Sequence, residues 1–473
     1  MKFIRNLTAL LVSDVFSKAI QFVVLGYLAR TLGTEGLGTF VWVQSVLLIF
    51  GLFPNFGLNE YGILRVAPDR SQENISRIVS DILNFRMFAA ALGVGTLIVL
   101  IYTEPHFTEY QALLLAGSSV LVIAVVGSDW LFTALEKQAL IGLYRFVARA
   151  VYLGAVLAFV RSSDDVMPAV VVYVAGEAVF SLGLFIHARR ATQWSWVSVG
   201  LGRLKLILQS AWPFAVLMAN GSVLYYIDLF LIGILLPMQE AGIYGGALRI
   251  VAPFISIKYL FGQLIYPKLA RWTANPEDVR GLNVLTETIN RYGTLMGLAL
   301  VSVLILFSRE LVVLVLGPAF ASAWWAFSLL SLALFAEFCW IAFPYLTVCI
   351  NTKLYTGIVL VTTVGKVLAL LLIVPIFGVT GGAIVYSAST LMIFILSVIY
   401  VRRHSIAVPV VKLMVGPSVL AALMLAAAFA LESPWPRLAA WVSLLGVSAA
   451  YLALIGQRFS RSRITEDLHI MNA

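Results

Sequence analysis

A single aspartate, Asp228, interrupts the apolar stretch VLYYIDLFLIGILL at residues 223–236. Other ionisable residues also lie inside long apolar segments. The bases are Lys18, Arg145, Arg149, Arg249, Lys258 and Lys366, and the acids are Asp14, Asp129, Glu177, Asp228 and Glu337. A charge inside a membrane costs about 2.5–3.5 kcal/mol or more unless it is paired or hydrated. Each of these residues is therefore a candidate either for a structural ion pair or for a functional site.

Depth along neighbouring helices, at about 1.5 Å per residue, gives most of these charges a candidate partner. Asp14 and Lys18 are four residues apart on one helix and can pair directly. Matched depth suggests the further pairs Asp129–Arg145, Arg149–Glu177, Asp228–Arg249 and Glu337–Lys366. Lys258 receives no partner by this criterion. Structural pairing and a functional role stay open as alternatives for each pair.

The sequence contains no recognisable catalytic constellation. The histidines His106, His187, His404 and His469 are scattered at loops or segment ends. No metal-ligand spacing, nucleotide-binding loop or nucleophile motif is present. We therefore predict that the protein is not an enzyme and has neither a metal site nor a cofactor.

The composition indicates which elements carry these charges. Of 473 residues, 61% are hydrophobic and only 12% are charged, about half the charged share of a soluble domain. Continuous apolar runs long enough to cross a bilayer predict an all-α polytopic membrane protein with about 14 transmembrane helices. The predicted spans are 8–29, 37–58, 84–103, 109–135, 138–160, 166–187, 208–236, 243–267, 288–308, 321–350, 354–376, 380–401, 410–431 and 437–456.

Basic residues between the spans alternate from one side to the other. With the N-terminus inside, the outer links hold only Arg30, Arg161, Arg309 and Arg437, and the other basic residues between spans lie inside. This bias predicts that both termini are cytoplasmic. It also explains the net charge of +9 without a nucleic-acid partner. The first apolar run is too long for a signal peptide and reads as the first span.

Two halves of the chain resemble each other. The outer links TEGLGTF (34–40) and QEAGIYG (239–245) are similar, and each precedes a span that is followed by an amphipathic cytoplasmic segment, 68–86 or 275–291. Both amphipathic segments are expected to lie on the membrane surface. We predict two six-helix lobes in a parallel pseudo-repeat, at 1–187 and 208–401. A basic cytoplasmic link (188–207) joins them, and 402–473 adds two spans and a tail.

Four segments resemble hallmark regions of a known family. They are LARTLGTEGLGTF (28–40), IDLFLIGILLPMQEAGIYGGALRI (227–250), LGPAF (316–320) and NTKLYTGIVLVTTVGKVLALLLIVPIFGVTGGAIVYS (351–387). Together they are similar to the polysaccharide-unit, or O-antigen type, flippases of the MOP exporter superfamily. The resemblance covers most of the first twelve spans.

The resemblance implies a mechanism and a location. Members turn an undecaprenyl-pyrophosphate-linked oligosaccharide from the cytoplasmic to the periplasmic leaflet of the bacterial inner membrane by alternating access, and ion-gradient coupling is expected. Helices 1, 2, 7 and 8 are implied to line the central cavity. Candidate partners are the lipid bilayer, the lipid-linked glycan, and polysaccharide polymerase and chain-length proteins.

The same resemblance ranks the buried charges. An anionic pyrophosphate needs basic contacts, so Lys18, Arg249 and Lys258 are predicted anion contacts, with Arg30 as a weaker candidate. Arg249 and Lys258 lie on opposite sides of a regular helix, and Pro253 between them could bend that helix.

Other roles and functions remain open at this point. Asp228 and Asp14 are candidates for ion coupling or for pairing. Alternative functions are a lipid II flippase or a multidrug exporter of the same superfamily. A membrane polysaccharide polymerase is disfavoured because the outer links are short.

Overall fold

The computed structural model describes residues 2–273 and 279–403. The predicted spans 410–431 and 437–456 lie outside the described residues. Within the described part the chain is helical and contains no strand, which confirms the all-α prediction. Eight of its helices are long and apolar enough to cross a membrane, as expected for a multi-pass membrane protein. The full count of about 14 spans stays a prediction.

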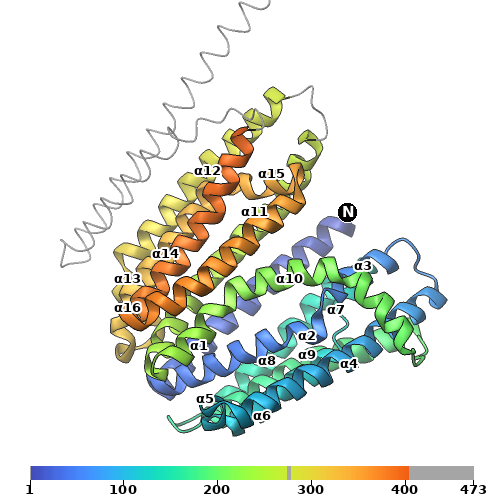
Figure 1. Ribbon diagram of the computed structural model, residues 1–473, viewed down its shortest axis with the longest axis horizontal. Coiled ribbons are helices and arrows are strands. Elements are labelled where there is room, and N and C mark those ends of the chain that lie inside the picture. Colours follow the sequence, from blue (N-terminus) through green and yellow to red (C-terminus); the bar gives the residue numbers. More distant parts are fainter. Residues whose placement is uncertain (1, 274–278, 404–473) are drawn as a thin grey trace, which may run out of the picture. The chain divides into compact units, whose positions relative to one another are not determined.

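The helices follow one another with short connections (Figure 1). They are α1 (Lys2–Phe50), α2 (Leu52–Asn55), α3 (Leu58–Val66), α4 (Gln72–Thr103), α5 (Pro105–Glu109), α6 (Gln111–Val125), α7 (Asp129–Ala134), α8 (Gln138–Phe159), α9 (Val166–Thr192), α10 (Leu201–Leu235), α11 (Met238–Thr273), α12 (Val279–Leu306), α13 (Ser308–Leu316), the 3₁₀ helix η2 (Pro318–Ala323), α14 (Trp324–Cys339), α15 (Ala342–Ile350) and α16 (Thr352–Arg403).

Helix α1 contains two of the predicted spans. At Gly33 the backbone has φ 70° and ψ −171°, a conformation that strongly favours glycine. Figure 1 shows α1 turning back on itself. The predicted spans 8–29 and 37–58 are therefore two helices joined at a glycine, with the TEGLGTF segment just after the turn. Helix α16 has a similar break at Gly378.

Two predicted spans of the first half are broken helices. The second span is interrupted at Phe56 and Gly57, which have φ 29° and 67°, so that α3 starts afresh at Leu58. The fourth span stops at Val125 and resumes at Asp129. Breaks of this kind are tolerated in membranes where protein groups satisfy the freed backbone atoms.

Arg86 provides such a group at the break in the fourth span, and it also contacts the side chain of Asn59 just after the break in the second span. Its guanidinium donates hydrogen bonds to the carbonyl oxygen of Gly127, at 2.5 Å, and to Asn59 Oδ1, at 2.7 Å. Arg86 is 1% exposed, and Glu60 and Asp129 are electrostatic neighbours of it. The expectation from the sequence that Arg86 is one of the inside charges stays a prediction.

The apolar faces of the two amphipathic segments pack against protein cores, and their expected position on the membrane surface stays a prediction. In α4 the apolar residues Ile75, Ile78, Val79 and Ile82 are buried in a protein core shared with Trp130 and Leu131. In α12, Leu282 is buried in a second core, and Leu285 and Ile289 pack against it. The same apolar periodicity fits either environment. Here each amphipathic segment continues directly into the following span as one helix.

The described chain forms two compact units that do not follow chain order. The first unit comprises residues 1–246, 315–320 and 367–382. The second unit comprises 247–314, 321–366 and the residues from 383 onward. In the second unit α12 packs closely on α14, where Gly293 leaves no space for a Cβ beside the carbonyl oxygen of Phe338. The predicted lobe boundaries at 187 and 208 stay a prediction.

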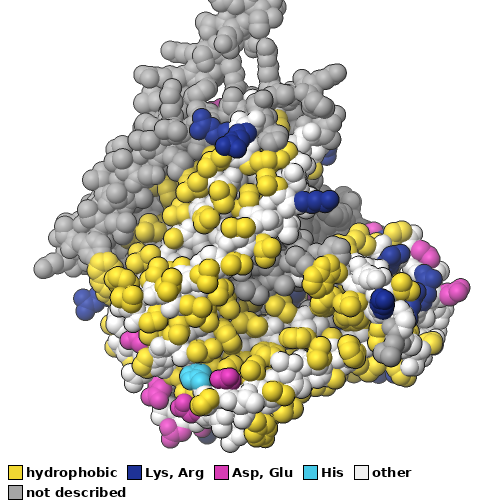
Figure 2. Space-filling view, in the orientation of Figure 1, with side chains coloured by type: hydrophobic (Ala, Val, Ile, Leu, Met, Phe, Trp, Pro, Cys, Tyr) yellow, Lys and Arg dark blue, Asp and Glu magenta, His cyan; other side chains and the backbone are white. Residues whose placement is uncertain are grey.

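The two ends of the first unit differ in their exposed charges. Figure 2 shows both basic and acidic side chains near α3 and the start of α4, and acidic side chains with a histidine near α5. Arg65, Arg70 and Arg77 are exposed at the first end, and Glu104 and Glu109 are exposed at the second. The orientation with the basic links inside stays a prediction.

Candidate functional site

The two similar outer segments cross each other within the first unit. Gly38 of α1 lies against the start of α11, and Gly242 of α11 lies against Thr34. A Cβ at Gly38 would overlap the carbonyl oxygen of Met238, and one at Gly242 would overlap that of Thr34. The added carbons would also lie 2.8 Å from Gly242 N and 3.0 Å from Gly38 N, respectively. We call residues 34–42 and 238–246 the glycine crossing.

The contacts at the glycine crossing are reciprocal. Gly38 meets the residue four before Gly242, and Gly242 meets the residue four before Gly38. This reciprocity is the signature of a local two-fold axis between corresponding segments. It aligns Gly38 with Gly242, which shifts the pairing read from the sequence by one residue. Close backbone approach of this kind is typical of small residues at membrane helix contacts.

Trp42 extends the contact surface of the glycine crossing. This side chain is fully buried, and its indole nitrogen donates a hydrogen bond of 3.3 Å to the carbonyl oxygen of Phe230. Gly233 leaves space for the indole, since a Cβ there would overlap it. The ring centroids of His106 and Phe107 lie 4.8 and 5.6 Å from that of Trp42. Aromatic packing therefore joins the α5 end to this contact.

Arg30 and Asp228 both lie near the glycine crossing. Arg30 is exposed at the end of the first helical segment of α1, and its aliphatic stem lies beside Gly317. Asp228, in α10, is fully buried and accepts a hydrogen bond of 3.0 Å from the hydroxyl of Tyr244 in α11. Our sequence reading missed this partner. Arg249 belongs to the second unit, so its pairing with Asp228 stays a prediction.

Two further predicted residues, Asp14 and Lys18, lie in the first helical segment of α1. Lys18 is half-buried in α1. The side chain of Asp14 lies outside the described residues, so the predicted Asp14–Lys18 pair stays a prediction.

One ion pair in each unit tests the pairs that were predicted from matched depth along neighbouring helices. Arg149 Nη2 lies 3.3 Å from Glu177 Oε1, which confirms the predicted pair between α8 and α9. In the second unit, however, Glu337 pairs with Lys258, with Nζ 3.2 Å from Oε2. The expectation that Lys258 has no partner is therefore wrong. Lys366, the partner expected for Glu337, lies 4.7 Å from the ring centroid of Tyr386, a favourable cation–π geometry.

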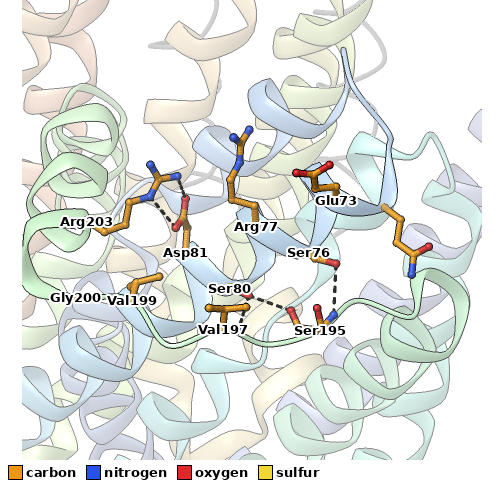
Figure 3. Close-up of a pocket in the computed structure, with 11 residues that line it drawn as sticks. Glu73, Ser76, Arg77, Ser80, Asp81, Ser195, Val197, Val199, Gly200 and Arg203 are labelled. Atoms are coloured by element: carbon orange, nitrogen blue, oxygen red, sulfur yellow. Dashed lines mark hydrogen bonds and ion pairs between the residues drawn. The ribbon is translucent and has the colours of Figure 1, made fainter.

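A second polar site in the first unit was not predicted from the sequence. The segment after α9 runs along α4 in extended form, and three side chains of α4 bind its backbone. Figure 3 shows two of them, Ser76 and Ser80. Asn84 Nδ2 donates to the carbonyl oxygen of Val197 at 2.8 Å. Ser80 Oγ accepts from Val197 N at 3.1 Å and donates to Ser195 O at 3.2 Å. Ser76 Oγ accepts from Ser195 N at 3.4 Å.

An ion pair completes this α4–linker contact, which comprises α4 residues 72–84 and linker residues 193–203. Arg203 donates two hydrogen bonds to the carboxylate of Asp81, at 3.0 and 2.6 Å. Accepting these hydrogen bonds, the carboxylate raises the pKa of Arg203. The surrounding cavity of about 730 Å³ is also lined by Arg77 and Glu73. The four-residue spacing of Ser76, Ser80 and Asn84 is the sequence signal for this contact.

A protein family and individual proteins are similar to this chain in sequence. The family described as "Polysaccharide biosynthesis protein" matches residues 3–272. A putative O-antigen transporter of Shigella dysenteriae is 24% identical over 272 residues, which cover 56% of this chain and 67% of the relative. A probable low-salt glycan biosynthesis flippase of Haloferax volcanii is 22% identical over 334 residues, covering 68% and 67%.

Solved structures share the fold at low sequence identity. The lipid II flippase MurJ in an inward closed conformation has a TM-score of 0.75 at 10% identity, covering 96% of this chain and 99% of that one. An inward-facing MATE multidrug resistance transporter of the MOP superfamily has a TM-score of 0.60 at 14% identity, covering 87% and 98%. These likenesses establish the MOP exporter fold.

Proposed function

The chain belongs to the polysaccharide biosynthesis protein family, and we propose that it is a flippase for lipid-linked oligosaccharides. Relatives of this chain are named as an O-antigen transporter and a glycan biosynthesis flippase. The family resemblance of the sequence supplies the carrier, undecaprenyl pyrophosphate, and the direction, from the cytoplasmic to the periplasmic leaflet. Transport rather than catalysis is the proposed activity.

The glycine crossing is the observation that carries this proposal beyond family membership. Corresponding segments of the two repeats meet there through reciprocal backbone contacts. Alternating access requires two halves that can separate at one membrane face and close at the other. The centre of this contact consists of backbone atoms, so separating it would break the long hydrogen bond from Trp42 to Phe230 rather than an ion pair. We assign it to the periplasmic side because it lies toward the acidic α5 end of the first unit.

The predicted anion contacts keep that role as part of the proposal. Lys18, Arg249 and Lys258 would bind the pyrophosphate inside the cavity, where water lowers the cost of a charge. Arg30 would contact it near the outer end. For Lys258, the ion pair with Glu337 provides a charge-compensated state when substrate is absent.

Asp228 is assigned to pairing or to ion coupling, and Asp228→Asn separates these roles. The variant keeps an oxygen that can accept the Tyr244 hydrogen bond but removes the charge. Transport that loses its dependence on an ion gradient, at normal protein levels, would support coupling. Gradient-dependent transport in the variant would leave pairing as the role. Asp14 has the same two proposed roles.

The proposal includes a location. The protein would reside in the bacterial inner membrane with both termini in the cytoplasm. Polymerase and chain-length proteins that use the flipped unit are proposed partners.

Reconstitution tests the proposed function directly. Purified protein in proteoliposomes should move a fluorescent undecaprenyl-pyrophosphate oligosaccharide between leaflets faster than protein-free vesicles do. Lys18→Ala and Lys258→Ala should slow this movement while leaving the amount of protein unchanged. Full transport by a protein that carries both Lys18→Ala and Lys258→Ala would overturn the anion-site assignment.

A deletion strain distinguishes the alternatives. Lipid-linked repeat units should accumulate on the cytoplasmic face, and cells should continue to divide. Lysis with arrested cell-wall synthesis would instead indicate a lipid II flippase. Sensitivity to cationic drugs with normal surface polysaccharide would indicate a multidrug exporter.

A further inference from the structure

Lys258 and Glu337 form a largely buried ion pair in the second unit. Lys258 is 14% exposed in its side chain and Glu337 is 9% exposed. The pair connects α11 with α14, and both residues belong to the second unit. Each charge offsets part of the cost of burying the other, so removing one raises the cost of burying the other.

The type of base decides how such a pair behaves. An arginine that grips a carboxylate through two hydrogen bonds, as Arg203 grips Asp81, is held in one geometry. A lysine carries a compact charge on a flexible stem and can direct its three donors to a new acceptor. Lys258 is therefore suited to exchanging partners, whereas Arg203 is suited to a fixed contact.

A phosphate oxygen can take the place of a carboxylate oxygen beside Lys258. Both are anionic acceptors for an ammonium group at about 2.7–2.9 Å. Exchanging Glu337 for a phosphate would keep Lys258 compensated throughout. The carboxylate of Glu337 would then need a proton, a water molecule or another cation as its partner. This cost weakens the binding of the phosphate and favours its release.

We propose that Glu337 is an internal competitor of the substrate phosphate for Lys258 and thereby sets the affinity for the anionic carrier. This inference rests on the proposed function, because it assumes an anionic lipid substrate. Glu337 is a positioning residue in this scheme, since it acts through Lys258. The pair would close when substrate leaves, so that an empty transporter does not retain an uncompensated lysine in the membrane.

Binding measurements on three variants test the proposal. The full-length protein in nanodiscs is titrated with undecaprenyl pyrophosphate and, as the uncharged control, with undecaprenol. Lys258→Gln should weaken binding of the pyrophosphate about tenfold, equivalent to about 1.4 kcal/mol. Glu337→Gln should tighten binding by about the same factor. Neither should change binding of undecaprenol. Glu337→Asp keeps the charge but has a shorter side chain, so it should tighten pyrophosphate binding less than Glu337→Gln does. It also allows the test if Glu337→Gln does not fold.

The first unit offers a matched control. Arg149 and Glu177 form a pair at 3.3 Å, and Glu177→Gln should leave pyrophosphate binding unchanged. Equal effects of Glu177→Gln and Glu337→Gln, or weaker binding in Glu337→Gln and Glu337→Asp, would overturn the proposal and leave a purely structural pair.

The proposed function is tested separately. If the wild-type protein moves no lipid-linked oligosaccharide in proteoliposomes, the proposed function fails. If it does move the substrate but the Glu337 variants bind pyrophosphate normally, only the competitor proposal fails.

Discussion

The glycine crossing and the α4–linker contact lie in the same unit but are built from different interactions. At the crossing, backbone atoms of Gly38 and Gly242 meet with no side chain between them. At the linker contact, Ser80, Asn84 and the Asp81–Arg203 pair fix an extended segment with hydrogen bonds. Separating the second contact would leave a buried carboxylate unpaired, which is costly. The first contact is therefore suited to separating during transport, and the second to keeping the linker attached to α4.

The largest effect is expected from adding a methyl group at the glycine crossing. Gly38→Ala and Gly242→Ala place a Cβ where a backbone carbonyl oxygen already lies. Overpacking costs about 1–3 kcal/mol, so the closed arrangement should be disfavoured about 5- to 150-fold relative to the open one, and transport should be slower. Flipping rates in proteoliposomes measure this loss.

Control variants and a labelling experiment show whether the crossing has separated. Gly95→Ala and Gly154→Ala place a Cβ in open space and should transport normally. Leu37 is fully buried, so a cysteine introduced there should react with a membrane-impermeant maleimide faster in the glycine variants. Normal transport by both Gly38→Ala and Gly242→Ala would show that the crossing is not a moving contact.

A smaller effect, mainly on stability, is expected at the α4–linker contact. Asp81→Asn removes the charge that Arg203 grips, and the unfolding free energy should fall by about 1–3 kcal/mol. Thermal unfolding of the purified protein measures the change. Transport per folded molecule should stay near the wild-type value, because this contact is expected to remain closed throughout the cycle.

The exposed pair Arg70–Glu136 provides the control for this prediction. Its side chains are 43% and 73% exposed, so Glu136→Gln should change stability by less than about 0.5 kcal/mol. A loss of transport in Asp81→Asn as large as in the glycine variants would remove the distinction between the two contacts.

The smallest effect concerns a polar loop beside the glycine crossing. The carboxylate of Asp165 accepts hydrogen bonds from the backbone N–H groups of Arg161 and Ser162, at 2.7 and 2.8 Å. These bonds lower the pKa of Asp165. Its contribution to stability is therefore complete above the ordinary carboxyl pKa and is lost as the pH falls through the lower folded value.

Unfolding measured against pH detects this contribution. Asp165→Asn should reduce the acid dependence of stability slightly and leave flipping at neutral pH unchanged. An unaltered pH profile would show that the loop does not contribute to stability.

The sequence predicted the spans and the repeat because both depend on periodicity and composition. Apolar length and charge alternation define membrane helices without knowledge of their neighbours. The similarity of 34–40 to 239–245 located the two segments that meet at the glycine crossing. It could not show that they touch, nor resolve the one-residue shift that aligns Gly38 with Gly242.

Pairing of charges could be predicted only in part. Depth identified Arg149–Glu177 because consecutive helices of a hairpin are neighbours. It failed for Glu337, whose partner is Lys258, because depth does not specify the direction in which a side chain leaves its helix. Similarly, the apolar stripe of α4 did not reveal whether lipid or protein covers Ile78 and Ile82.

The glycine crossing also bears on the surroundings in which the protein works. A closure between backbone atoms contains no ion pair at its centre, so dissolved salt has little to screen there. The fluid outside a bacterial inner membrane changes its ionic strength with the environment of the cell. If the protein lies in that membrane and the glycine crossing closes its outer side, as we propose, the seal between Gly38 and Gly242 should be the same in dilute and in concentrated media.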